Sequence, residues 1–158
     1  MFAGSEETKG TAYVSLVRPH LEHASAVCDP YRQNQVEKLE AIQNRAVRFI
    51  KRDYSYNTSV SDLKNSLSLS LLCERRKFHR LQIFHKSVHN DIALPIPPYY
   101  LLYTREIRNY SATSFIQPSI HHDYYTYSFF PRTIKDWNCL SPVTRSLNYS
   151  AFCCAKLF

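Results

Sequence analysis

The chain has 158 residues, is 44% hydrophobic and carries a net charge of +7. This length is enough for a single domain of ordinary size, and no apolar run approaches the roughly 18 residues that a membrane-spanning helix needs. Glycine occurs only at positions 4 and 10. Phosphate-cradling loops and dinucleotide-binding turns depend on glycine, so the sequence excludes nucleotide-binding folds of those kinds.

The positive charge is concentrated in one part of the sequence. Residues 32–86 contain 12 Lys and Arg against 5 Asp and Glu, a balance of +7, whereas the rest of the chain contains 8 of each kind. This segregation predicts an acidic partner, for which a nucleic-acid backbone and an anionic membrane surface are the usual candidates.

The residue pattern of the N-terminal part predicts one helix. Residues 1–10 are polar, and we expect them to be disordered. Thr11 can cap a helix that runs to Val27, and Pro19 predicts a kink in it because proline lacks a backbone donor. A turn is predicted at the Asp-Pro dipeptide that follows.

The strongest helix signal extends from Asn34 to Arg52. Hydrophobic residues recur there at three- and four-residue steps, which predicts one apolar stripe, and basic residues fall on another side. The stripe consists of Val36, Leu39, Ile42, Ala46, Phe49 and Ile50, and the basic side of Lys38, Arg45, Arg48 and Arg52. The pattern predicts an amphipathic helix of about five turns, with one face toward a core and another toward anions.

Two more helices are predicted before the chain changes character. A short one is capped by Thr58 or Ser59 and ends near Asn65, and a long one extends from Ser70 to a left-handed stop at Asn90. The apolar stripe of the long helix consists of Leu71, Phe78, Leu81, Phe84 and Val88, and its basic side of Arg76, Lys77 and Arg80. We expect the two basic helices to pack through their stripes and to leave a continuous cationic surface.

Prolines at positions 95, 97 and 98 predict an extended connection, so we place the main boundary there. It separates a helical region, residues 11–93, from a Pro- and aromatic-rich connecting region, residues 94–158. In the latter we expect short strands over 114–117 and 124–130, a helix over Arg132–Cys139 and a last short helix over Ser150–Phe158. The predicted fold class is mainly α, with a helical bundle followed by a partly irregular or short-stranded C-terminal region.

The segment SFFPRTIKDWNCL is expected to anchor the C-terminal region. Ile134, Trp137 and Leu140 share a broad face, which favours burial of Trp137. The alternative is an exposed tryptophan that stacks on bases. Arg132, Lys135 and Asp136 are expected to face solvent.

The sequence predicts no metal, cofactor or catalytic site. His79, His85 and His89 are close in sequence, but zinc-ligand spacing is missing, and surface histidines are expected. The aspartates are dispersed, without a pair that could hold two metal ions. The five cysteines lack CxxC spacing and the N-terminus lacks a signal sequence, which predicts reduced, buried thiols in an intracellular protein, cytoplasmic or nuclear and not secreted.

Four motifs together carry a family resemblance. They are LVRPHLEHASAVCDPY, VEKLEAIQNRAVRFI, ERRKFHRL and SFFPRTIKDWNCL. In this order they resemble the C-terminal part of reverse transcriptases from non-LTR (LINE-type, jockey-like) retrotransposons, over about Thr11 to Phe158. The chain departs from the family at His23 and Cys28, where Tyr and Trp are common.

The resemblance implies a fragment of an RNA-directed DNA polymerase: the helical thumb-like region and connecting segment that follow the palm. The palm aspartates that hold catalytic magnesium are absent, so we expect no enzymatic activity from this chain alone. The expected partners are RNA or an RNA–DNA hybrid, and the palm region if the full element is expressed, without a membrane role. The residues predicted to contact nucleic acid are Arg45, Arg48, Arg52, Arg76, Lys77 and Arg80.

An alternative hypothesis uses the same helices differently. The chain is then a non-catalytic protein-interaction module, or a degenerate transposon-derived module, without a nucleic-acid role. Its apolar helix faces, which a palm would cover in the parent enzyme, would bind another protein or a second copy.

Overall fold

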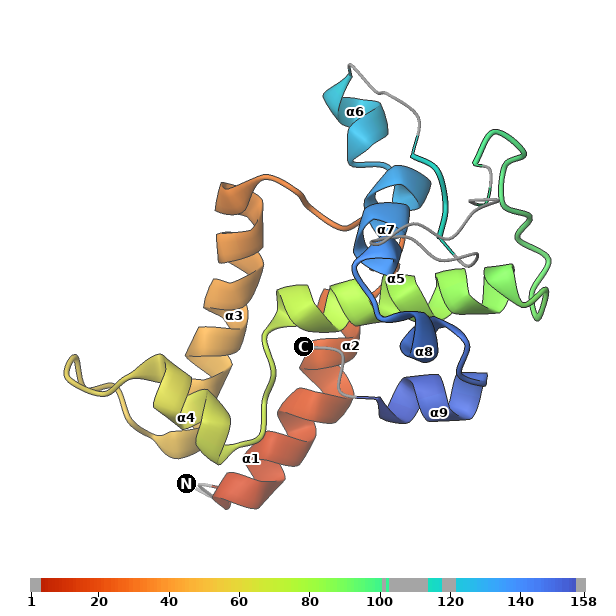
Figure 1. The fold of residues 1–158 in the computed structure, drawn as a ribbon. Helices are drawn as coiled ribbons and strands as arrows, with labels where there is room; N and C mark the ends of the chain where they lie inside the picture. Colours follow the sequence, from red (N-terminus) through yellow and green to blue (C-terminus); the bar gives the residue numbers. More distant parts are fainter. Residues whose placement is uncertain (1–3, 101, 103–113, 118–121, 156–158) are drawn as a thin grey trace. The chain divides into compact units, whose positions relative to one another are not determined.

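The computed structural model describes residues 4–100, 102, 114–117 and 122–155 (Figure 1). These residues form helices and no strand, apart from an isolated antiparallel bridge between Leu102 and Phe115, which confirms the mainly α fold. The chain divides into two compact units, Met1–Arg76 and Lys77–Phe158. The division falls inside a helix, whereas the sequence predicted it near residue 94.

The first unit begins with three consecutive helical segments: α1 (Glu6–Ala12), the π-helical η1 (Tyr13–Val17) and α2 (Arg18–Glu22). The Ser5 side chain caps α1 by accepting a hydrogen bond from the Thr8 N–H, at 3.2 Å. The helix therefore starts before Thr11, and the prediction of disorder is wrong for residues 6–10. Residues 1–3 lie outside the described residues.

Pro19 explains the π-helical segment. Its ring would meet the carbonyl group four residues earlier in a regular α-helix, and it cannot donate the corresponding hydrogen bond. Residues 13–17 take the wider π-helical form just before it, a known way of absorbing an irregularity without ending a helix. The predicted kink is thus observed as a change of helix type.

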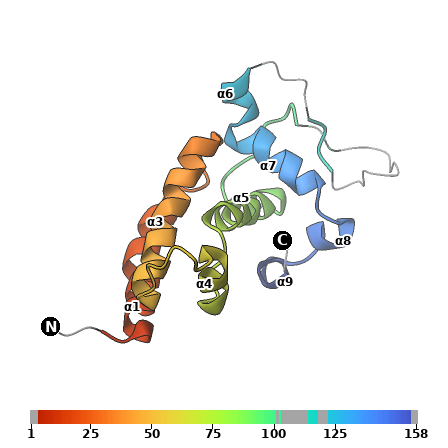
Figure 2. The same ribbon diagram turned by 90° about the vertical axis from the view of Figure 1, so that its left-hand side faces the viewer.

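The predicted central helix is α3 (Gln33–Lys51), whose bounds agree with the prediction to one residue. Arg52 ends it in the left-handed conformation, with φ of 55°. α3 packs against α1, beside it in Figure 2, and against α4 (Val60–Ser66). α4 follows Ser59, as predicted.

The buried face of α3 is offset by one residue from the predicted stripe. Gln43, Val47 and Ile50 are at most 2% exposed. Ile42 and Phe49, which we expected in the core, are 40% and 55% exposed. The apolar stripe predicted from periodicity is therefore wrong for these two residues.

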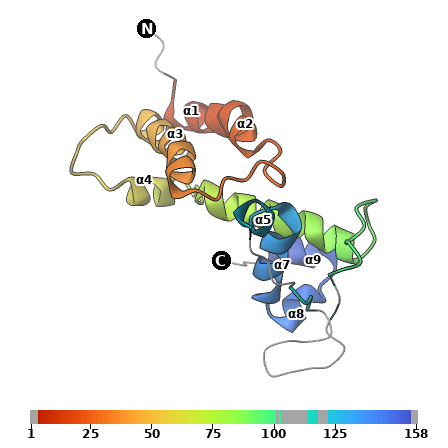
Figure 3. The same ribbon diagram turned by 90° about the horizontal axis from the view of Figure 1, so that it is seen from above.

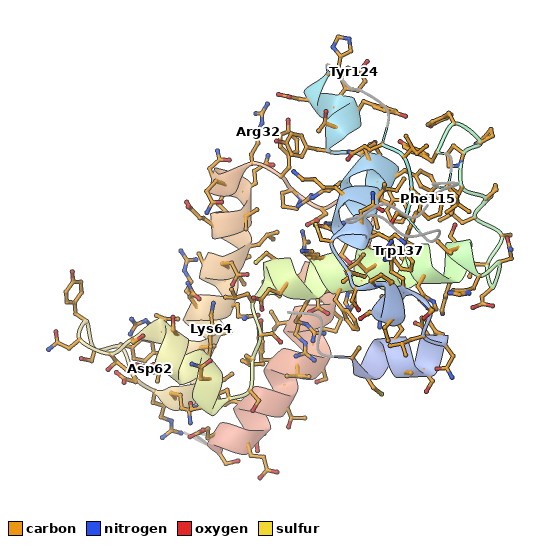
Figure 4. All side chains as sticks on the ribbon, viewed as in Figure 1. Arg32, Asp62, Lys64, Phe115, Tyr124 and Trp137 are labelled. Atoms are coloured by element: carbon orange, nitrogen blue, oxygen red, sulfur yellow. The ribbon has the colours of Figure 1, made fainter. Side chains whose placement is uncertain are left out.

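Gln43 of α3 is fully buried in the first unit. The Tyr13 hydroxyl donates a hydrogen bond to Gln43 Oε1 at 3.0 Å, and Gln43 Nε2 donates one to the Ser70 carbonyl at 2.9 Å. Burial raises the pKa of Tyr13 to about 12. Lys64, labelled in Figure 4, adds a second polar link through its 3.0 Å ion pair with Glu40. Polar side chains thus join α3 to its neighbours.

The long helix, α5, extends over Leu72–Val88 and spans the division between the units. It begins at Leu72, so the residue directly before it is Leu71 and not Ser70, the predicted N-cap. Leu72 is fully buried, whereas Leu71, expected in the apolar stripe, is 40% exposed. Asn90 has φ of 58°, which confirms the predicted left-handed stop.

The core of the second unit is largely aromatic. It consists of Leu81, Phe84, Tyr100, Phe115, Ile134, Trp137 and Phe152. The Phe84 ring meets those of Trp137 and Phe115 edge-on, with centroids 5.2 and 5.4 Å apart. Trp137 and Phe115 are labelled in Figure 4. Trp137 lies on α7 (Phe129–Asn138) and is fully buried, as predicted. The apolar side chains of α5 from Phe78 to Val88 therefore pack within this unit.

Three short helices complete the second unit: α6 (Asp123–Thr126), α8 (Pro142–Arg145) and α9 (Tyr149–Cys154). α6 and the start of α7 contradict the strand predicted over 124–130. Pro142 begins α8, which lies between the two C-terminal helices that the sequence predicted. Figure 3 shows α8 and α9 beside α5 and α7, and Phe152 of α9 contributes to the core.

Candidate nucleic-acid interface

The six predicted contact residues do not share one environment. Arg45 is exposed on α3, and Arg52 is exposed directly after this helix, where its guanidinium donates one hydrogen bond to the Gly4 carbonyl at 3.3 Å. Arg76 and Arg80 on α5 are buried, at 6% and 2% exposed. These two residues therefore do not belong to an exposed cationic surface, which corrects the prediction for them.

Arg48 organises the loop after α3. Its guanidinium donates hydrogen bonds to three backbone carbonyls, those of Ser55 at 2.9 Å, Asp53 at 3.3 Å and Thr58 at 3.4 Å. Several donors in a fixed planar arrangement suit such a cluster of acceptors. Arg48 is half-buried and has a structural role in this loop.

Arg76 ties the start of α5 to α2 and to the segment that follows α2. It donates to the Leu21 carbonyl at 2.6 Å and pairs with Asp29 at 3.5 Å. The neighbouring Arg75 pairs with Glu22, and this hydrogen bond raises the pKa of Arg75. Both arginines thus satisfy polar groups inside the first unit.

Lys77 and Arg80 meet the same carboxylate in the second unit. Asp136 of α7 lies 2.7 Å from Arg80 and 3.3 Å from Lys77. Burial and the nearby Arg132 lower the pKa of Arg80, and Asp136 opposes this shift. Asp136 was expected to face solvent, but it is a partner of two cations at the α5–α7 contact.

The exposed cations of α3 form a line. Lys38 and Arg45 are seven residues apart on α3, so they fall within about 20° around the helix and lie about 10 Å apart along it. Arg52 follows at the same spacing in sequence, directly after the last helical residue and in the left-handed conformation. Ile42 and Phe49 lie between them. We call the set Lys38, Ile42, Arg45, Phe49 and Arg52 the basic face of α3. Helical spacing places no Asp or Glu of α3 on this face.

The sequence could have revealed this face. The same periodicity that suggested an apolar stripe also places Ile42 and Phe49 next to the basic residues. Only the burial of Gln43 decides which side is inside, and a glutamine gives no hydrophobic signal.

The histidines and cysteines form no metal site among the residues that the structure describes. His85 is 1% exposed, its Nε2 lies 2.8 Å from the Leu147 carbonyl and burial lowers its pKa, so the expectation of a surface histidine is wrong here. The cysteines are free, and those at 28, 73, 139 and 154 are exposed, contrary to the prediction of buried thiols.

The first unit also has a cavity of about 280 Å³. It is lined by Gly10, Thr11, Val14, Ile50, Leu67 and Leu69. None of these side chains titrates, so the cavity provides no general acid, base or metal ligand. In the described part of the chain, no helix combines the length and apolarity needed to cross a bilayer.

Comparison with known proteins yields no match among family models, curated proteins or solved structures. The resemblance to reverse transcriptases therefore stays a prediction from the four motifs.

Proposed function

We propose that the chain is the thumb-like segment of a non-LTR retrotransposon reverse transcriptase and that it binds the backbone of RNA or of an RNA–DNA hybrid. The family assignment rests on the four motifs. The observation that carries the binding proposal is the line of Lys38, Arg45 and Arg52 on the basic face of α3.

Charge and geometry support this use of the face. The three cations extend over about 20 Å of helix, a length that can follow a strand of phosphates. Among the described residues, no carboxylate forms an ion pair with Lys38 or Arg45. The electrostatic attraction of an exposed cation for phosphate is greater when no carboxylate already neutralises its charge, because a paired cation must first break its ion pair.

The proposed contact set is smaller than the one predicted from the sequence. It keeps Arg45 and Arg52 and adds Lys38. Arg76 and Arg80 are left out because they are buried, and Arg48 because it holds the loop after α3. Lys77 is left out because Asp136 pairs with it.

Reversing one charge on the basic face tests the proposal. Arg45→Glu should weaken binding to a fluorescent RNA–DNA hybrid about tenfold near 0.1 M salt, because each phosphate contact releases about one counterion. The slope of log affinity against log salt should also fall by about one. Fluorescence anisotropy titrations at several salt concentrations measure both quantities.

Lys135→Glu is the matched control, since Lys135 is exposed on α7 and the change in net charge is the same. We expect it to alter affinity only slightly. Equal losses in both variants would mean that net charge, and not the face, drives binding. An affinity that does not change with salt would overturn the proposal.

We propose no polymerase activity for this chain alone. The resemblance places the magnesium-binding aspartates in a palm, and the chain has no motif for them. In a primer-extension assay with magnesium and an RNA template, we expect no nucleotide incorporation. The control is a reverse transcriptase with an intact palm in the same buffer. Template-dependent extension by the purified 158-residue chain would contradict this prediction.

A protein-interaction role is the second candidate. The observation in its favour is a group of exposed apolar side chains in η1: Leu16 is 67% exposed, Val17 40% and Val14 37%. Exposed apolar side chains within one short helical segment favour contact with another protein. Self-association in light scattering, together with no binding in the RNA titrations, would favour this candidate.

A further inference from the structure

We infer that the basic face of α3 accepts an unpaired nucleotide, with the Phe49 ring stacked on the base while the cations contact the phosphates on either side. This inference rests on the proposed function and specifies its ligand as single-stranded nucleic acid. It starts from the surroundings of Phe49.

Phe49 is surrounded by positive charge. It lies four residues after Arg45 and three before Arg52, which puts it about 6 Å and 4.5 Å from them along the helix axis. The Lys9 ammonium of α1 lies 4.8 Å from the ring centroid. The Phe49 ring therefore lies beside the Lys9 ammonium of α1, with Arg45 about one helical turn before it on α3 and Arg52 directly after the helix.

The Phe49 ring is held in place but is still accessible. Lys9 occupies one face of the ring in a cation–π contact, which restrains its orientation. The side chain is nevertheless 55% exposed. More than half of this residue is therefore accessible to a second planar group.

The chemistry of this site favours an unpaired base over a duplex. In a duplex the bases are stacked on one another and only their edges are accessible, so a phenyl ring at the backbone gains little. An unpaired base offers a whole π-face, and stacking on an aromatic side chain next to cations is the usual way in which proteins bind single strands. Such contacts tolerate any base, so we expect little sequence preference.

The test compares one RNA in two forms: a fluorescent 12-nucleotide single strand and the same strand annealed to complementary DNA. Wild type should bind the single strand more tightly at equal salt. Phe49→Ala should weaken single-strand binding about tenfold, the loss typical of one base–aromatic stack, and leave hybrid binding within about twofold. Phe49→Trp should restore single-strand affinity.

Two controls make the result specific. Tyr124→Ala removes another exposed aromatic ring, on α6, and should change neither affinity. Circular dichroism melting of each variant verifies that the fold is retained. Tighter binding to the hybrid, or equal losses for both forms in Phe49→Ala, would overturn the inference while leaving the backbone-binding proposal intact. Salt-independent or absent binding to both forms would overturn the two together.

Discussion

Replacing Trp137 with alanine should lower the free energy of unfolding by about 3–5 kcal/mol, the range for removing a fully enclosed aromatic side chain. Trp137 has no exposed surface, and its ring contacts Phe84 with centroids 5.2 Å apart and Phe152 at 6.1 Å. These rings come from α5, α7 and α9, so the cavity left by the missing indole ring would weaken the packing among all three helices. Urea unfolding followed by circular dichroism at 222 nm measures the loss, because Trp137 is the only tryptophan.

Val143→Ala is the control for this measurement, since Val143 is 72% exposed on α8 and should change the free energy of unfolding by less than about 0.5 kcal/mol. RNA affinity distinguishes the buried role from the stacking role that the sequence left open. A Trp137→Ala variant with wild-type unfolding and about tenfold weaker RNA binding would show that the ring acts on bases.

Asp136→Asn is expected to have the second largest effect, a loss of about 3 kcal/mol. It removes the negative charge that lies 2.7 Å from Arg80, whose side chain is 3% exposed, whereas Asp136 itself is 22% exposed. Removing the carboxylate beside a buried cation is much more costly than removing both charges. Arg132 increases the cost because it faces Arg80 with the same charge. Urea unfolding again gives the number.

Two companion variants show whether the buried charge causes the effect. The double variant Arg80→Met with Asp136→Leu removes both charges and should recover most of the stability. Lys77→Met removes the partner that is 33% exposed and should cost less than about 1 kcal/mol. If Asp136→Asn unfolds like wild type, the ion pair does not stabilise the second unit. If Arg80→Met mainly weakens RNA binding, the original assignment of Arg80 to the interface is restored.

The elements with local signals were predictable from the sequence. α3 and α4 have regular periodicity or a serine cap within a few residues, and their bounds were close to the prediction. The end of α5 was marked by Asn90, which tolerates the left-handed conformation better than most residues. Burial of Trp137 followed from helical spacing, because Ile134 lies three residues earlier on the same face.

The roles of the charged residues were not predictable in this way. Arg80 and Asp136 are 56 residues apart in sequence, and no local pattern shows that the two meet. The same holds for Arg76 and Asp29. The basic side of α5 was therefore predicted to face solvent or a nucleic acid. In the structure, most of the α5 cations form ion pairs with carboxylates of the same unit. The π-helical turn was also hidden, since Pro19 indicated an irregularity but not its form.

The hydrogen bonds of Gln43 have a consequence for how this sequence can evolve. The Tyr13 hydroxyl donates a hydrogen bond to the side-chain oxygen of Gln43, a residue that is 0% exposed. A change of Tyr13 to phenylalanine would therefore leave this buried oxygen without a donor. Replacing Gln43 first by an apolar residue would instead leave the Tyr13 hydroxyl without its acceptor. Either single step is costly, whereas the exchange of both for apolar residues loses less. Positions 13 and 43 should therefore covary among related chains, with phenylalanine at 13 accompanied by leucine or methionine at 43.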